Sequence, residues 1–71
     1  MEVKHIIPSP SEAAAMRNAI AETMAGILFE RSAFDLEAAF STLAASGFPQ
    51  PMIRELAETA IERAMARATR H

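Results

Sequence analysis

Apolar side chains recur along this chain at the three- and four-residue intervals of an amphipathic α-helix, in three separate stretches. The first stretch predicts a helix over residues 10–30. Its apolar face has close to heptad spacing, with Asn18 and Glu22 opposite, and comprises Ala13, Met16, Ile20, Met24, Ile27 and Leu28. A second strip of small residues, Ala15, Ala19 and Gly26, would let another helix approach closely. This helix can therefore be covered on two sides.

The start of the first helix has the clearest local signal in the sequence, Ser9-Pro10-Ser11-Glu12. Ser9 can cap the helix, Pro10 suits the first helical position, and Glu12 completes a capping box. Before it, residues 1–9 predict a short extended arm, because Val3, Ile6 and Ile7 are β-branched and Pro8 favours extended geometry in the residue before it.

The second stretch predicts a helix over residues 33–45, with Ser32 as its N-cap and Asp35 favouring the positive end of the helix dipole. One face carries apolar side chains at helical spacing, namely Leu36, Ala39, Phe40 and Leu43. Gly47 follows, and glycine readily takes the left-handed conformation that ends a helix. Phe48 can then pack back on the last turn.

The third stretch predicts a helix over residues 51–68, with Pro51 at its first position. Its apolar stripe comprises Ile53, Leu56, Ala57, Ala60, Ile61, Ala64 and Ala68. Glu55, Glu58 and Glu62 form an acidic face on the far side. A third strip contains Arg63, Arg67 and Arg70, which are spaced at i, i+4 and i+7. Together the three stretches predict one all-α domain over residues 1–71, a three-helix domain with a short extended N-terminal arm.

The length of the chain limits its core. A domain of 71 residues buries only about 60% of the surface that its unfolded chain exposes, and small scaffolds need an additional source of stability. The sequence has no cysteine for disulfides, and neither of its two histidines belongs to an acidic cluster with metal-ligand spacing. We therefore expect a homodimer with its main interface on the first helix, formed by Ala15, Met16, Ala19, Ile20, Met24 and Ile27.

Composition bears on the cellular setting of the chain. The absence of cysteine fits a reducing compartment, and we see neither a signal peptide nor a run of about 18 apolar residues that would span a membrane. We expect a cytoplasmic protein. Sixteen alanines and six arginines against one lysine indicate a GC-rich coding genome, bacterial or phage.

An enzyme is not expected from this sequence. His5 and His71 lie near opposite ends, so no acid–base pair or triad is apparent, and two glycines are too few for a phosphate-binding loop. We expect no cofactor and no catalytic residue. The function that remains is protein–protein interaction, in a small regulator, adaptor or inhibitor that binds a larger protein.

Aromatic and basic residues are the candidate partner contacts. Phe29, Phe34 and Phe48 lie at helix ends or in connections, where they either close the core or serve as exposed anchors. The arginine strip of Arg63, Arg67 and Arg70 could hold phosphate or an acidic protein surface. Alternatively, arginines in the final turns complement the helix dipole and cover the edges of the core.

A dimeric DNA-binding regulator is the alternative hypothesis. The last two predicted helices, joined by a turn with Gly47, have the spacing of a helix-turn-helix unit, in which Gln50 and Arg54 would contact bases. Against this, the net charge is −2 and Glu55, Glu58 and Glu62 would repel phosphates. A nucleic-acid partner is therefore not the one we expect. Gly47-Phe48 between two helices resembles ubiquitin-associated domains, but Ser46 replaces their usual methionine, and we assign no family.

Overall fold

The computed structural model describes residues 10–69, and every regular element in that range is a helix. The helices are α1 (Pro10–Arg31), α2 (Leu36–Ala45) and α3 (Gln50–Thr69). The predicted all-α class with three helices is confirmed. The predicted arm over residues 1–9, including the Ser9 cap, and the predicted contacts of Arg70 lie outside the described residues.

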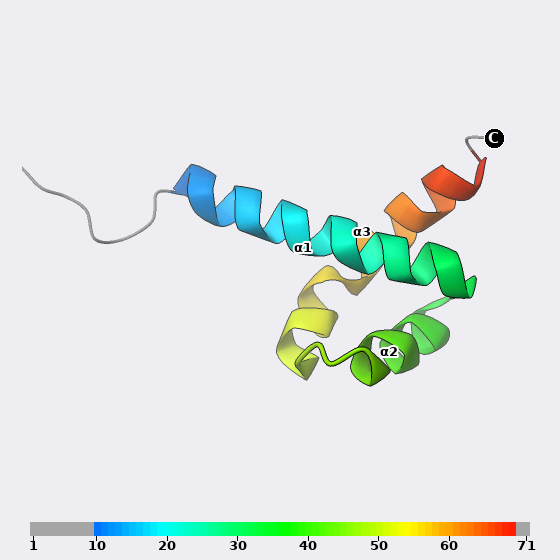
Figure 1. The fold of residues 1–71 in the computed structure, drawn as a ribbon. Helices are drawn as coiled ribbons and strands as arrows, with labels where there is room; N and C mark the ends of the chain where they lie inside the picture. Colours follow the sequence, from blue (N-terminus) through cyan, green and yellow to red (C-terminus); the bar gives the residue numbers. More distant parts are fainter. Residues whose placement is uncertain (1–9, 70–71) are drawn as a thin grey trace, which may run out of the picture.

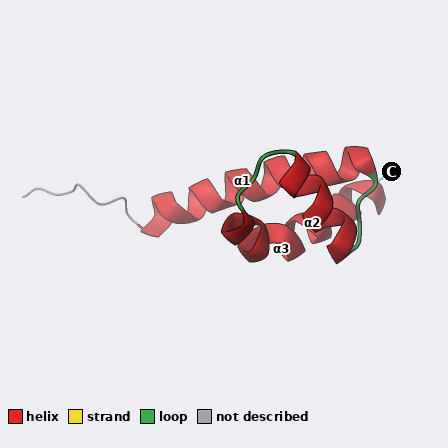
Figure 2. Cartoon of the chain, turned by 90° about the horizontal axis from the view of Figure 1, so that it is seen from below, coloured by secondary structure: helices red, strands yellow, loops and turns green. Residues whose placement is uncertain are grey.

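The three helices form one core. α1 and α3 make the most extensive contact, and they cross at an angle in Figure 1. α2 returns the chain beneath them, and from below it covers the near side of the α1–α3 pair (Figure 2). The largest fully buried side chains are Met24 and Leu28 of α1, Leu43 of α2 and Ile53 of α3. All four belong to apolar faces that the sequence predicts.

The core is thin. Of the twelve buried apolar residues in the described range, seven are alanines. Alanine lets helices approach closely, but each one removes less apolar area from water than a leucine does. The many alanines therefore limit the apolar area that this short chain buries.

The buried face of α1 differs from the predicted apolar face. The core residues of this helix are Ala21, Met24, Ala25 and Leu28, whereas Met16 is 62% exposed. Of the predicted apolar face, Met24 and Leu28 are therefore buried within the single chain, whereas Met16 is not. The reason is tertiary, because α3 and α2 pack beneath the second half of α1 and leave its first turns uncovered.

Both connections begin with the same helix-ending motif. After α1, Ser32 adopts a positive φ of 55°, and the amide of Ala33 donates a hydrogen bond to the carbonyl of Leu28 at 2.9 Å. After α2, Gly47 has φ 100°, and the amide of Phe48 donates to the carbonyl of Leu43 at 3.2 Å. These are the bonds of a Schellman motif, so the predicted role of Gly47 is confirmed.

The N-cap of α2 is Asp35, whereas the sequence predicted Ser32. Asp35, with extended backbone, is the N-cap, and its Oδ1 accepts a hydrogen bond from the amide of Ala38 at 2.7 Å. The helix begins at Leu36 rather than at residue 33. Ser32 cannot cap it, because Ser32 is used to terminate α1. The next helix, α3, begins at Gln50, where the carbonyl of Pro49 accepts bonds from Met52 and Ile53 at 3.0 and 3.1 Å.

Candidate interaction surfaces

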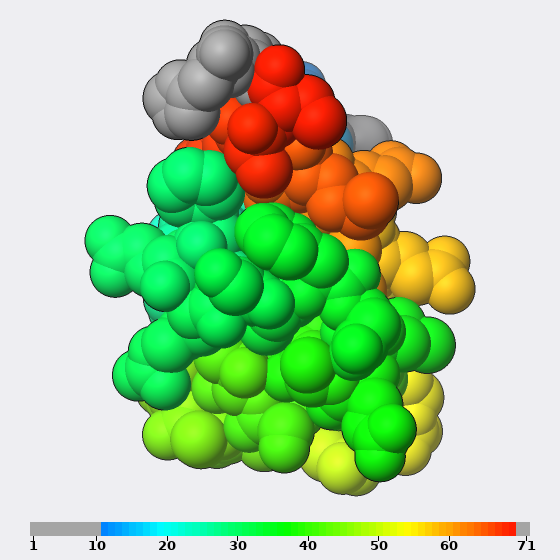
Figure 3. All heavy atoms as spheres, turned by 90° about the vertical axis from the view of Figure 1, so that its right-hand side faces the viewer, coloured from blue at the N-terminus to red at the C-terminus, as the bar shows by residue number. Residues whose placement is uncertain are grey.

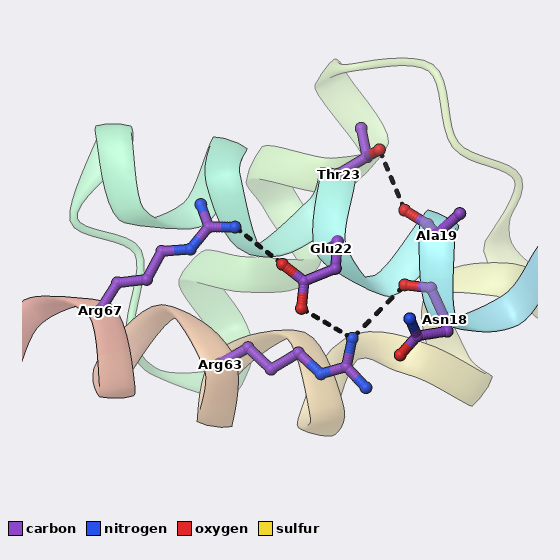
Figure 4. Close-up of polar contacts among 6 residues, drawn as sticks. All are labelled: Asn18, Ala19, Glu22, Thr23, Arg63 and Arg67. Carbon is purple, nitrogen blue, oxygen red and sulfur yellow. Dashed lines mark hydrogen bonds and ion pairs between the residues drawn. The ribbon is translucent and has the colours of Figure 1, made fainter. Parts of the chain in front are cut away.

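A three-residue ion cluster joins α1 to α3. Glu22 accepts a hydrogen bond at each carboxylate oxygen, from Nη1 of Arg63 at 2.9 Å and from Nη2 of Arg67 at 2.9 Å. Arg63 also donates to the backbone carbonyl of Asn18 at 3.4 Å. Figure 4 shows both guanidinium groups reaching up from α3 toward the same carboxylate. Two of the three arginines in the predicted partner-binding strip are therefore occupied within the chain.

This cluster is partly solvated. The side chains of Arg63, Arg67 and Glu22 are 32%, 37% and 49% exposed. Water and salt therefore screen the attraction, and each pair contributes modestly. Next to the cluster, the hydroxyl of Thr23 donates a hydrogen bond to the carbonyl of Ala19, one turn earlier on α1, at 3.1 Å (Figure 4).

A shallow apolar groove lies where α1 meets the start of α3. It has a volume of about 350 Å³ and is lined by Arg17, Ile20, Pro49, Pro51, Met52, Glu55 and Leu56. The two charged lining residues neutralise each other, because Nε of Arg17 lies 3.2 Å from Oε2 of Glu55. The remaining lining residues are apolar, so the groove offers hydrophobic contact with little net charge.

The first turns of α1 project beyond this groove. From Ser11 to Ala19 only Ala13 is half-buried, and every other residue is exposed. Figure 1 shows this blue part of α1 extending past α2 and α3. A helix segment of this length is marginal in water when nothing packs against it. The projecting half of α1, residues 11–19, contacts α3 through Arg17 and the carbonyl of Asn18, and its exposed residues include Met16 and two alanines of the predicted interface.

The six residues predicted for a dimer interface fall into three environments. Ala15, Met16 and Ala19 are exposed on the projecting half, whereas Ile20 and Ile27 are half-buried and pack against the core from its edge. Met24 has no exposed area and belongs to the core of the single chain. Periodicity placed it with Met16 because both lie on the same side of an ideal helix.

The predicted aromatic contacts close the core. Phe29, Phe34 and Phe48 are half-buried, and all three pack against the buried cluster. The contacts of these side chains in the structure are with the core, and each side chain retains a partly exposed edge. The large apolar side chains that are truly exposed within residues 10–69 are Met16, Leu36 and Met65.

Between Pro10 and Thr69, no three His, Cys, Asp or Glu side chains are grouped to hold a metal ion. In the same range, the core contains no polar or charged residue. No helix among the described residues has both the length and the hydrophobicity to cross a bilayer.

The residues predicted to read DNA are on the surface. Gln50 and Arg54 are exposed in the first turns of α3, as that hypothesis requires. Glu55, Glu58 and Glu62 are exposed on the same helix. Carboxylates at these positions would meet a phosphate backbone with like charge.

Comparison with known proteins adds no relationship, since neither a family model, nor a curated protein, nor a solved structure matches the chain. Sequence reasoning did not anticipate the role of Glu22, which it placed on the polar side of the first helix. The signal was present, because Arg63 and Arg67 are one turn apart and can share one carboxylate.

Proposed function

We propose that this chain is a non-enzymatic protein–protein interaction module, a regulator, adaptor or inhibitor that pairs with a second copy through α1. The observation that supports the proposal is the projecting half of α1, on which Met16 is 62% exposed beside the apolar groove lined by Ile20 and Met52. Burying this surface would supply the apolar area that the alanine-rich core lacks.

The proposed interface is the exposed face of α1 that contains Ala15, Met16, Ala19 and Ile20. Met16 and Ile20 are one turn apart, so they lie on one side of the helix. The two alanines allow a neighbouring backbone to approach closely. In a symmetric dimer each copy presents the same patch, and the Met16 side chain of one would fill the groove of the other.

The experiment is the solution mass, measured by light scattering over a concentration series at low and high salt. We expect twice the chain mass of 7.7 kDa at both salt concentrations, because the proposed contact is apolar. Met16→Asp places a charge in the interface and should return the mass to that of a monomer. Met65→Asp is the matched control, since Met65 is also exposed, at 49%, but lies on α3. A monomeric wild-type chain at the highest concentration would overturn the proposed pairing.

The DNA-binding hypothesis is tested in parallel. Binding of a labelled duplex would fall steeply with salt as counterions are released, and Arg54→Ala would weaken it. The acidic residues of α3 lead us to expect no binding at physiological salt. Salt-sensitive binding that Arg54→Ala removes would favour the alternative.

A further inference from the structure

We propose that the outward face of α3, formed by Glu58, Ile61, Glu62 and Met65, binds a basic amphipathic helix of another protein. This inference rests on the proposed function, because it gives the chemistry of the partner that such a module would bind. The α3 face is a different surface from the α1 face of the proposed dimer, so an experiment can contradict one proposal and leave the other standing.

The four residues form a continuous helical face. Their spacing of i, i+3, i+4 and i+7 places them on one side of α3. Met65 is 49% exposed, and Ile61 is half-buried, with one side against the core and the other accessible. Figure 3 shows the orange part of α3 on the molecular surface, beside the green segment that leaves α1. The flexible side chain of Met65 can adapt its conformation to the surface of a partner.

The charges of α3 are divided between its two sides. Arg63 and Arg67 turn toward α1, where both bind Glu22. Glu58 and Glu62 are exposed on the outer side, and neither makes an ion pair within the part of the chain that the structure describes. Arg54, one turn before Glu58, is the exposed cation nearest to them along the helix. The outer face therefore carries an excess of negative charge.

The two carboxylates repel each other in the free chain. Glu58 and Glu62 are one turn apart, a spacing at which like charges destabilise a helix. By contrast Glu55, on the same helix, is neutralised by Arg17 at 3.2 Å. A partner that places cations opposite Glu58 and Glu62 removes this repulsion and gains the apolar contact of Ile61 and Met65.

A basic amphipathic helix has that complementary pattern. Lys or Arg residues one turn apart match the spacing of Glu58 and Glu62, and an apolar residue between them can pack on Met65. The same carboxylates repel the phosphates of nucleic acids and of anionic lipids. Charge complementarity therefore selects a basic protein segment as the occupant.

The test uses a fluorescent amphipathic peptide of leucine and lysine at helical spacing, with fluorescence anisotropy as the readout. We expect saturable binding that weakens with salt. A matched peptide with glutamate in place of lysine should not bind. Met65→Ser should weaken the lysine peptide by about tenfold, as the loss of an apolar anchor does. Met16→Ser removes another exposed methionine, 62% exposed on α1, and should leave peptide binding unchanged.

Charge-matched variants separate a site from general attraction. Glu58→Lys and Glu62→Lys change the net charge as much as Glu30→Lys does, and all three residues are exposed. We expect only the two α3 variants to abolish binding. Equal weakening by Glu30→Lys, or no effect of Met65→Ser, would overturn the proposed site. If the wild-type chain is a dimer that does not bind the lysine peptide, the proposed α3 site is wrong and the proposed pairing stands. If the wild-type chain is a monomer that binds the peptide, only the proposed pairing is wrong.

Discussion

The guanidinium of Arg67 lies over α1, where its Nη2 donates to Oε1 of Glu22 at 2.9 Å, across 45 positions of sequence. The same carboxylate binds Arg63 through its other oxygen. Two cations of α3 therefore converge on one acid of α1, and both arginines are engaged within the chain although about a third of each side chain stays exposed.

Replacing Glu22 by alanine should lower the free energy of unfolding by about 1 kcal/mol, since two partly solvated ion pairs are lost. For a domain of this size that corresponds to a fall in Tm of roughly 4–8 °C. Thermal unfolding followed by circular dichroism measures it. Glu62→Ala is the control, because Glu62 is exposed and makes no ion pair within residues 10–69. Equal destabilisation by both variants would show that the cluster contributes nothing specific.

The two leucines of α2 should respond very differently to truncation. Leu43→Ala removes a fully buried side chain and should cost about 2–5 kcal/mol, a large share of the stability of a small domain. Leu36→Ala, at a position 47% exposed on the same helix, should change stability by less than about 1 kcal/mol. Denaturant unfolding of the two variants at one protein concentration makes the comparison. Similar midpoints would contradict the packing described for α2.

Ser32→Gly should stabilise the chain. Ser32 has φ 55°, a left-handed conformation that costs a non-glycine residue about 1–2 kcal/mol and glycine almost nothing. Part of this gain is lost to the greater freedom of glycine in the unfolded chain, so we expect a net increase of about 0.5–1 kcal/mol. Ser46→Gly is the contrast, because Ser46 has φ −80° and ψ −7° and gains no such relief. Its Tm should fall while that of Ser32→Gly rises.

The two glycines should tolerate alanine in opposite ways. At Gly47 a Cβ would meet nothing within 4 Å, yet φ is 100°, so Gly47→Ala should cost about 1–2 kcal/mol through the backbone alone. Gly26 is inside α1, where alanine gains up to about 1 kcal/mol of helix propensity. The new Cβ would lie 3.2 Å from Nη1 of Arg67, at the flexible end of that side chain. We expect Gly26→Ala to be neutral or stabilising in thermal unfolding, and a large loss would show that Arg67 cannot move.

Removing the cap of α2 should be measurable on its own. Asp35→Ala loses the 2.7 Å hydrogen bond to the amide of Ala38 and should destabilise the chain by about 1 kcal/mol. Asp35→Asn keeps a side-chain oxygen at the cap and should retain most of the stability. Ser32→Ala leaves this cap intact, so a loss as large as that of Asp35→Ala would restore Ser32 as the capping residue.

Local patterns of residue types were sufficient to predict the three helices and the end of α2. Leu43 and Ile53 lie at the buried positions of strong apolar stripes, so local periodicity already assigned them to the core. Gly47 terminates α2 because few other residues take its backbone conformation at low cost, and a pattern of residue types reveals that directly. The first connection was misread at Ser32, because serine and aspartate are both good caps and only the path of the chain chooses between them.

Packing between the helices determines which part of α1 is covered and which charges meet. Periodicity gives the direction of a helix face but not how far along the helix its neighbours extend. For this reason Met16 and Met24 looked equivalent, although one is 62% exposed and the other has no exposed area. The pairing of Glu22 with Arg63 and Arg67 likewise depends on the crossing of α1 over α3. Contacts across 41 and 45 positions arise from packing, and no local pattern in either helix specifies them.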